Sequence, residues 1–218
     1  MVNLLERRIV ETIMRPRRGL DPRSGKVALT FDDGPHPLAT DQIVEILGFY
    51  QVPATFFVVG ERVREHQDLV RLLHDSGHQV GSHSQTHPDP WKIGLRSLHA
   101  EYQGAARLVS SFSAPGTPRL FRPPKGHVDF ETAVVTRILG LRTWLWTIDS
   151  NDWQPGIGAD DILLCTAGAD SGDVILLHDG LEAPLDDRAL DRSATVSALP
   201  RLIESLRAKG LRLVVLPA

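Results

Sequence analysis

The sequence is poor in cysteine and has no long hydrophobic run. Cys165 is the single cysteine among 218 residues, which excludes an internal disulfide. It lies in the apolar run DILLCTAG, which favours a buried structural thiol. No stretch is long enough to span a membrane. The first residues, MVNLLERRIVETIMRPRRG, lack the apolar core and the small-residue cleavage site of a secretory signal, so we expect a cytoplasmic protein.

An excess of basic charge is also missing. The formal net charge is -3, and the sequence contains neither a Gly-rich phosphate loop nor a basic-aromatic patch. We therefore expect no nucleic-acid partner. Hydrophobic residues at 42%, charged residues at 23%, and 15 Pro with 18 Gly describe an ordinary globular protein with many turns, of a length that fits one domain. The sequence does not indicate an oligomeric state.

The first 24 residues carry a pattern of their own, and we expect them to form an amphipathic helix and a linker that precede a domain at 25–218. Four apolar residues recur at helical spacing, namely Val2, Leu5, Ile9 and Ile13. Arginines at 7, 8, 15, 17 and 18 make the helix basic. Residues 1–18 could contact an anionic membrane surface, or the helix could pack on the domain itself, which base rates favour.

From Lys26 onward, patterns of strands and helices alternate. Strands are predicted at 26–31, 54–59, 78–83, 119–122, 141–148, 173–178 and 212–216, and helices at 39–49, 62–75, 94–111, 130–139, 159–168 and 194–208. This alternation is typical of an α/β domain with mostly parallel strands. A distorted, partly open barrel and a doubly wound sheet both fit the strand count, and periodicity does not choose between them.

Chemically reactive side chains follow the strand ends in five separate segments. They are Asp32 and Asp33, His83 and His87, Arg122, Asp149 and Asp152, and His178 and Asp179. The carboxyl ends of parallel strands open on one face of such a domain, which is where these folds place their active sites. The five segments therefore predict a single pocket.

One part of that pocket has the composition of a metal site. The segment HSQTH holds His83 and His87 four residues apart, close enough on one helical turn to bind one metal ion. With an upstream Asp, the pair forms a set of two His and one carboxylate that suits zinc, or iron, cobalt or nickel. A bound metal could hold and acidify a water molecule, and the second Asp of the doublet could take its proton. Taken alone, the Asp doublet would be a cap and turn, and the His pair would be chance.

Hydrolysis through such a water also needs a group that gives a proton to the leaving amine or alkoxide, and His178 suits that role. His178 ends an apolar strand, and a nearby carboxylate would keep its imidazole protonated near pH 7. Asp152 is the first candidate for that carboxylate and Asp149 the second. Arg122 lies between a strand and Pro123, well held to grip a carboxylate. The ordinary alternatives are a capped strand end for His178 and a surface salt bridge for Arg122.

Five segments in order, TFDDGP, HSQTH, RPPKG, DSNDW and LLHD, resemble the motifs of the polysaccharide deacetylase family, also called the NodB-homology domain or carbohydrate esterase family four. The resemblance runs from about Val27 to the end of the chain. It implies a distorted, partly open (β/α)7 barrel. The implied activity is metal-dependent removal of an acetyl group from an N-acetylated sugar, typically an N-acetylglucosamine unit of a glycan, an oligosaccharide or a lipid-linked sugar.

The resemblance also implies a role for individual residues. Asp32 would be the catalytic base, held by Arg122, and His178 the general acid, tuned by Asp152. The metal ligands would be Asp33, His83 and His87, with Zn²⁺ as the expected ion and Co²⁺, Ni²⁺ or Fe²⁺ as alternatives. The substrate-binding residues would be Pro124, Lys125, Trp153 and Leu176, with the backbone amide of Lys125 stabilising the oxyanion and with Trp153 and Leu176 lining the pocket for the acetyl methyl group.

Two features depart from the family pattern. Lys125 stands where a Tyr is usual, which would favour an anionic or phosphate-linked substrate or would leave the side chain in solvent. The missing export signal makes a small or lipid-linked substrate plausible. Two other functions stay open: a deacylase or amidase of a non-sugar compound, and a metal-dependent carbohydrate-binding protein without turnover. An iron oxygenase fits poorly, because its ligands usually run His-x-Asp followed by a distant His.

Overall fold

A computed structural model describes residues 10, 12, 15–182 and 190–217. Most of the predicted amino-terminal helix, including Val2, Leu5, Ile9 and Ile13, lies outside the described residues. Val10 is described, is helical and buried, and packs against Ala133. At this position the chain therefore contacts the domain itself. No helix in the described part of the chain has both the length and the hydropathy of a membrane span.

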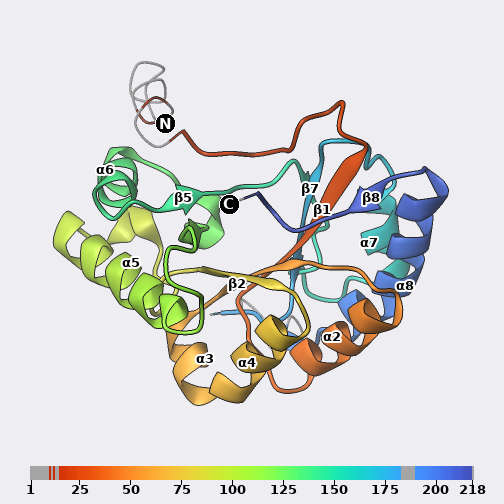
Figure 1. Ribbon diagram of the computed structural model, residues 1–218, viewed down its shortest axis with the longest axis horizontal. Helices are drawn as coiled ribbons and strands as arrows, with labels where there is room; N and C mark the ends of the chain where they lie inside the picture. Colours follow the sequence, from red (N-terminus) through yellow and green to blue (C-terminus); the bar gives the residue numbers. More distant parts are fainter. Residues whose placement is uncertain (1–9, 11, 13–14, 183–189, 218) are drawn as a thin grey trace.

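The described strands form one parallel sheet whose two ends do not pair with each other (Figure 1). Its order is β5-β4-β3-β2-β1-β7-β6, and β8 pairs with the beginning of β1. The bounds are β1 Lys26–Asp32, β2 Thr55–Val58, β3 Gln79–Ser82, β4 Leu120–Phe121, β5 Arg142–Thr143, β6 Ile148–Asp149, β7 Val174–His178 and β8 Arg212–Leu213. The sheet curls and stays open between β5 and β6, so the prediction of a distorted, partly open barrel is confirmed.

The predicted strand at 141–148 is wrong in one respect, because it is two short strands at opposite ends of the sheet order. Between them the backbone changes partners: the amide of Trp144 donates to Phe121, and the amide of Thr147 donates to Val174. Trp144, which lies between the two strands, is buried. An apolar run indicates that a segment is buried but not which strand lies next to it. The segment between β5 and β6 was therefore predicted as part of one continuous strand.

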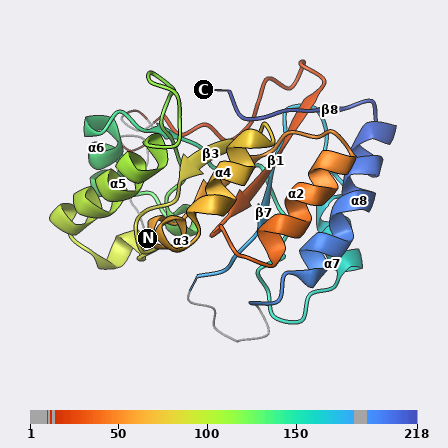
Figure 2. The same ribbon diagram turned by 60° about the horizontal axis from the view of Figure 1, so that its bottom comes forward.

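Helices cover the outside of the sheet (Figures 1 and 2). Their bounds are α2 Ala39–Phe49, α3 Gly60–Glu65, α4 Gln67–Asp75, α5 Leu95–Ser110, α6 Phe130–Ile138, α7 Ala159–Thr166 and α8 Ser193–Ala208, with short 3-10 turns η1 Pro90–Lys92 and η2 Pro124–Gly126. The predicted helix at 62–75 is divided at His66, which leaves helical geometry at φ -132°. Apolar side chains such as Phe31 of β1, Leu47 of α2 and Leu202 of α8 fill the space between sheet and helices.

Cys165 is exposed, so the expectation of a buried thiol is wrong. Helix α7 buries only one side, formed by Ile162 and Thr166, and Leu164 and Cys165 face solvent. The apolar run around Cys165 is therefore an amphipathic helix with an unusually apolar outer face.

The two ends of the strands have different surroundings. The linker lies against the edge strand β5, where the amide of Arg17 donates to Thr143 at 2.9 Å, and then against the amino end of β7, where the amide of Leu20 donates to Gly172 at 2.7 Å. At the carboxyl ends, the loops surround a pocket that contains most of the predicted site. The fold therefore leaves one end of the barrel available for chemistry.

Candidate active site

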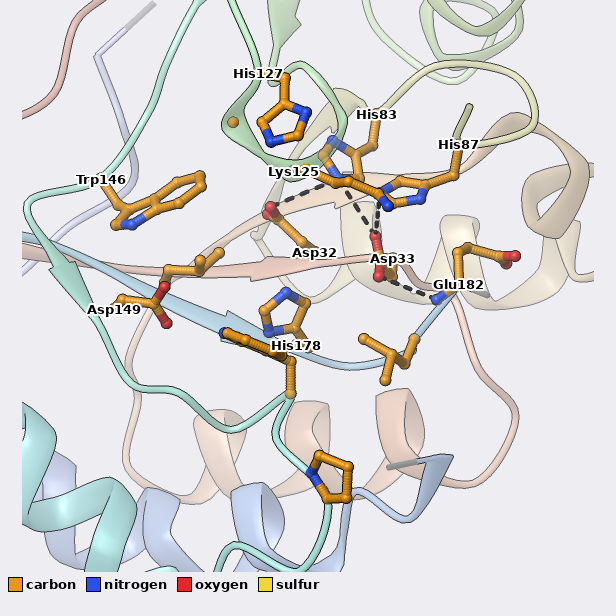
Figure 3. A pocket seen from close by; sticks show the side chains of 15 residues that line it. Asp32, Asp33, His83, His87, Lys125, His127, Trp146, Asp149, His178 and Glu182 are labelled. Atoms are coloured by element: carbon orange, nitrogen blue, oxygen red, sulfur yellow. Dashed lines mark hydrogen bonds and ion pairs between the residues drawn. The ribbon is translucent and has the colours of Figure 1, made fainter. Parts of the chain in front are cut away.

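A pocket of about 380 Å³ lies at the carboxyl ends of the strands (Figure 3). Eight of the predicted site residues line it: Asp32, Asp33, His83, His87, Lys125, Trp153, Leu176 and His178. Three others, Arg122, Pro124 and Asp152, are buried behind this lining. Residues from five separate segments therefore meet in one place, as the strand-end pattern predicts.

Three side chains in the pocket have the geometry of a metal site. Asp33 Oδ1 lies 3.3 Å from the Nε2 atoms of both His83 and His87, and one ligand atom from each residue lies within 4.8 Å of the others. The Asp33 oxygen is buried and has no conventional hydrogen-bond partner among the described residues. A buried carboxylate oxygen without a donor is costly, and a divalent cation would compensate it. The three residues fit such an ion.

The two His come from a loop rather than from the single helical turn that their spacing suggested. The chain after β3 takes left-handed conformations at Ser84 (φ 67°) and His87 (φ 54°). The His87 amide donates to Ser84 Oγ, which closes the loop. His83 Nδ1 lies 2.7 Å from the carbonyl oxygen of Arg122. A proton on Nδ1 leaves the Nε2 lone pair free for a metal, which is a common way to orient such a ligand.

The charges of Asp33 and His87 suit a cation. Burial lowers the pKa of His83, but the carboxylates of Asp32 and Asp33 outweigh it and raise this pKa, an effect that a cation bound to the Asp33 carboxylate would oppose. Burial raises the pKa of Asp33, but the neighbouring imidazoles of His83, His87 and His178 lower it well below its usual value. The Asp33 carboxylate is therefore ionised. Burial lowers the pKa of His87 to about 4, so its imidazole is neutral near pH 7, as a metal ligand must be.

Asp32 is held by a buried arginine. Arg122 Nη1 donates to Asp32 Oδ1 at 2.6 Å and to Thr30 Oγ1 at 2.9 Å. The remaining guanidinium donors reach the carbonyl oxygens of Trp144 and Leu145. Arg122 is fully buried, with its guanidinium carbon 4.2 Å from the centre of the Phe57 ring. The surface salt bridge considered for Arg122 is therefore excluded.

His178 is paired with Asp152 on the opposite side of the pocket. His178 Nδ1 lies 2.6 Å from Asp152 Oδ1, and the His178 amide donates to Asp152 Oδ2 at 2.8 Å. Thr195 also donates to Oδ2, and Arg192 donates to the Asp152 carbonyl oxygen. Burial lowers the pKa of His178, but the charge and hydrogen bond of Asp152 outweigh it and raise this pKa to about 9. The imidazole is therefore protonated at neutral pH.

Asp149 was the second candidate partner for His178 and does not take that place. It lines the pocket, and its Oδ1 accepts a hydrogen bond from the Asn151 amide at 2.9 Å. Its carboxylate thus shapes the loop that brings Asp152 to His178. Asn151 has φ 58°, a left-handed value that Asn tolerates better than most residues.

The turn after the Asp doublet is closed by a third buried carboxylate. A Cβ atom on Gly34 would overlap the side chain of Asp179, so only Gly fits there. Thr40 donates to Asp179 Oδ2 at 2.6 Å. Burial raises the pKa of Asp179 to about 7. This residue packs behind the turn and does not line the pocket, so its contact with Gly34 links the chain after β1 to the chain after β7.

Several pocket residues were missed from the sequence. His127, Trp146, Leu181 and Glu182 all line the pocket. His127 follows the RPPKG segment directly, which was a usable signal. Glu182 follows LLHD, and its amide donates to Asp33 Oδ2 at 3.1 Å while its carboxylate pairs with Arg62 at 2.6 Å. No sequence pattern pointed to that amide, because any residue type can supply it.

Comparisons with known proteins agree with this geometry. Residues 19–144 match the family model described as polysaccharide deacetylase. A chitooligosaccharide deacetylase from Sinorhizobium fredii is 37% identical over 207 residues, covering 90% of this chain and 94% of the relative. A peptidoglycan-N-acetylglucosamine deacetylase from Bacillus cereus is 33% identical over 191 residues, covering 86% and 84%.

Solved structures show the same relationship. The crystal structure of the Bc1960 peptidoglycan N-acetylglucosamine deacetylase, in complex with 4-naphthalen-1-yl-N-oxidanyl-benzamide, superimposes with a TM-score of 0.83 at 29% identity. The match covers 92% of this chain and 90% of the other. With the family model matching more than half of its residues, this chain belongs to the polysaccharide deacetylase family.

Proposed function

We propose that this protein is a metal-dependent hydrolase that removes the acetyl group from an N-acetylated sugar. The observation that carries the proposal is one pocket containing a fitting ligand set for a cation, an ion-paired carboxylate and a protonated imidazole. Asp32 Oδ2 lies 3.7 Å from His83 Nε2, so the expected base stands directly beside the ligand set. The names of the relatives point to the same reaction.

The reaction divides between the two sides of the pocket. A water molecule adds to the acetamide carbonyl carbon, and Asp32 takes the water's proton. A divalent cation on Asp33, His83 and His87 would polarise the carbonyl group and make the water more acidic. His178 then gives its proton to the sugar nitrogen as the carbon–nitrogen bond breaks. The products are acetate and a free amine. Asp32 then releases its proton to solvent, and His178 takes up a proton from solvent for the next turnover.

Other residues would position these groups. Arg122 fixes the Asp32 carboxylate and Asp152 fixes the imidazole of His178. The backbone amide of Lys125 is proposed to stabilise the developing oxyanion, with Pro124 holding the turn before it. Trp153 and Leu176 line the pocket and are proposed to contact the acetyl methyl group. Zn²⁺ is the proposed ion, because two His and one carboxylate form one of its common catalytic sets.

The proposed substrate is an N-acetylglucosamine oligomer or a lipid-linked sugar of the same type. The first matches the words chitooligosaccharide and N-acetylglucosamine in the names of the relatives. A cytoplasmic location and contact of residues 1–18 with a membrane surface stay predictions from the sequence.

The test is release of acetate from N-acetylglucosamine oligomers of defined length in the presence of Zn²⁺ or Co²⁺. Asp32→Asn should reduce the rate at least a hundredfold, since the base is lost while the shape is kept. Asp41→Asn, which changes an exposed Asp on α2, is the matched control and should keep full activity. Binding of the oligomer without any acetate release would instead support the alternative of a carbohydrate-binding protein. Full activity in Asp32→Asn would refute the assigned mechanism.

A further inference from the structure

Three residues beside the pocket form a cluster of mutual contacts that the proposed reaction does not use. The ring of Trp91, on η1, stacks on His127 with 3.6 Å between the ring centres and an angle of 5° between the planes. His127 Nδ1 lies 3.0 Å from Asp89 Oδ1. The same Asp89 oxygen accepts a hydrogen bond from the Trp91 amide at 3.1 Å. We call Asp89, Trp91 and His127 the stacked cluster.

The stacked cluster is continuous with the pocket. His127 lines the pocket and lies on the wall that also carries Lys125, near His83 (Figure 3). Trp91 is 55% exposed although it is one of the largest apolar side chains. A stack that begins at a pocket wall and ends in solvent gives a surface along which a chain-like substrate could leave the pocket.

The chemistry of this surface suits a sugar ring. A pyranose presents an apolar face of C–H groups, which packs on aromatic rings, and a rim of hydroxyl groups, which need hydrogen-bond partners. Trp91 supplies an amphipathic aromatic surface with few rotatable bonds. His127 keeps Nε2 for a hydroxyl group, because its Nδ1 is used by Asp89. Asp89 Oδ1 contacts both the His127 ring and the Trp91 amide, so the stack is oriented without a ligand, and such preorganisation reduces the entropic cost of binding.

We propose that the stacked cluster is a binding site for the sugar unit next to the one that is deacetylated. This inference rests on the proposed function, because it takes the substrate to be a glycan of more than one unit. Trp91 and His127 would touch that second sugar, and Asp89 would act only by orienting His127. The cluster would then select for oligomers over single sugars.

The experiment compares substrate lengths. Acetate release is measured with the Zn²⁺-loaded enzyme on the methyl glycoside of N-acetylglucosamine and on the N-acetylglucosamine tetramer. Trp91→Ala should lower kcat/KM for the tetramer about tenfold, the effect of losing one aromatic stacking partner, through a higher KM. The same variant should leave the single sugar within about twofold of the wild type. Phe49→Ala removes another exposed aromatic, on α2, and is the matched control that should change neither rate.

Two further variants keep the inference falsifiable if Trp91→Ala folds poorly by circular dichroism. His127→Gln should also weaken the tetramer selectively, and Trp91→Phe should restore most of the loss. An equal loss on both substrates, or no loss on either, would overturn the inference. Calorimetric binding of the tetramer to Asp32→Asn, with and without Trp91→Ala, gives a readout independent of turnover. If the wild type released no acetate from any length, the proposed function would fail, while this binding comparison would still decide for or against the sugar site.

Discussion

Left-handed backbone conformations occur at both ends of the strands, but mostly in different residue types. Left-handed backbone positions precede most of the strands at their amino ends. They include five glycines, namely Gly25, Gly77, Gly140, Gly172 and Gly210, and one other residue, Gln51 before β2. In the described parts of the loops at the carboxyl ends, two left-handed positions are glycine, Gly126 and Gly156, and five are not: Asp33, Ser84, His87, Lys125 and Asn151. Glycine adopts this conformation without steric cost, and other residues do so with strain. Most of the strained positions thus lie in the loops around the pocket, and three of them, Asp33, His87 and Lys125, line it.

Two buried histidines, one at each end of the strands, differ in the direction of their pKa shift. His78 lies at the amino end of β3, where its Nδ1 accepts a hydrogen bond from the Ala54 amide, and burial lowers its pKa to about 4. His178 ends β7, and Asp152 raises its pKa to about 9. Burial alone makes the His78 imidazole neutral, whereas at His178 the charge and hydrogen bond of Asp152 outweigh burial. The hydrogen-bonded carboxylate, and not the depth of burial, distinguishes the proposed general acid His178 from His78.

Arg122→Met should have the largest effect on this arrangement. It leaves the Asp32 carboxylate buried without its cation, which we expect to lower the free energy of unfolding by about 3–5 kcal/mol. Acetate release should also fall below detection. Urea denaturation of the metal-free protein measures the first effect. The double variant Arg122→Met with Asp32→Asn should recover much of the stability, and a failure to recover it would show that the guanidinium acts mainly through packing on Phe57.

Asp152→Asn should change the pH dependence of acetate release. His178 has a raised pKa, so it is protonated below about 9 and activity should fall as the pH rises through that value. Without the carboxylate the pKa drops, and the alkaline limb of the kcat/KM profile should move to lower pH. At pH 7 we expect a loss of about a hundredfold. The same linkage makes the wild-type pair stabilise the fold fully below pH 6.5 and lose that contribution as the pH rises through about 9.

Thr195→Val should have a smaller effect of the same kind as Asp152→Asn. It removes one hydrogen bond to Asp152 Oδ2 and keeps the carboxylate. The alkaline limb should move in the same direction but less far. An unmoved limb in Asp152→Asn would mean that another group limits activity at high pH.

Much of the fold and of the site could be predicted from the sequence, because both depend on local patterns. Alternating apolar runs predicted the parallel sheet, and chemically reactive residues after five of the seven predicted strands predicted the pocket. What failed depended on the course of the chain in space. A spacing of four fits both a helical turn and the loop that carries His83 and His87. The split of 141–148 depends on strand neighbours, and the place of His127 and Trp91 depends on how two loops meet.

Substitutions to and from glycine measure the backbone cost of left-handed positions at the two ends of the strands, and we expect their effects to be the smallest. Gly77 has φ 79°, and a Cβ atom there would meet nothing within 4 Å, so Gly77→Ala isolates the backbone cost. We expect it to lower the free energy of unfolding by about 1 kcal/mol. Gly48→Ala, at an equally open position inside α2, should raise it by about 0.5–1 kcal/mol, because alanine favours a helix. Lys125→Gly should also stabilise the protein, by about 0.5 kcal/mol, since it relieves a left-handed lysine at φ 58°. If urea denaturation showed Lys125→Gly to be destabilising, contacts of the lysine side chain would outweigh the backbone strain, and the pocket loops would not be storing it at this residue.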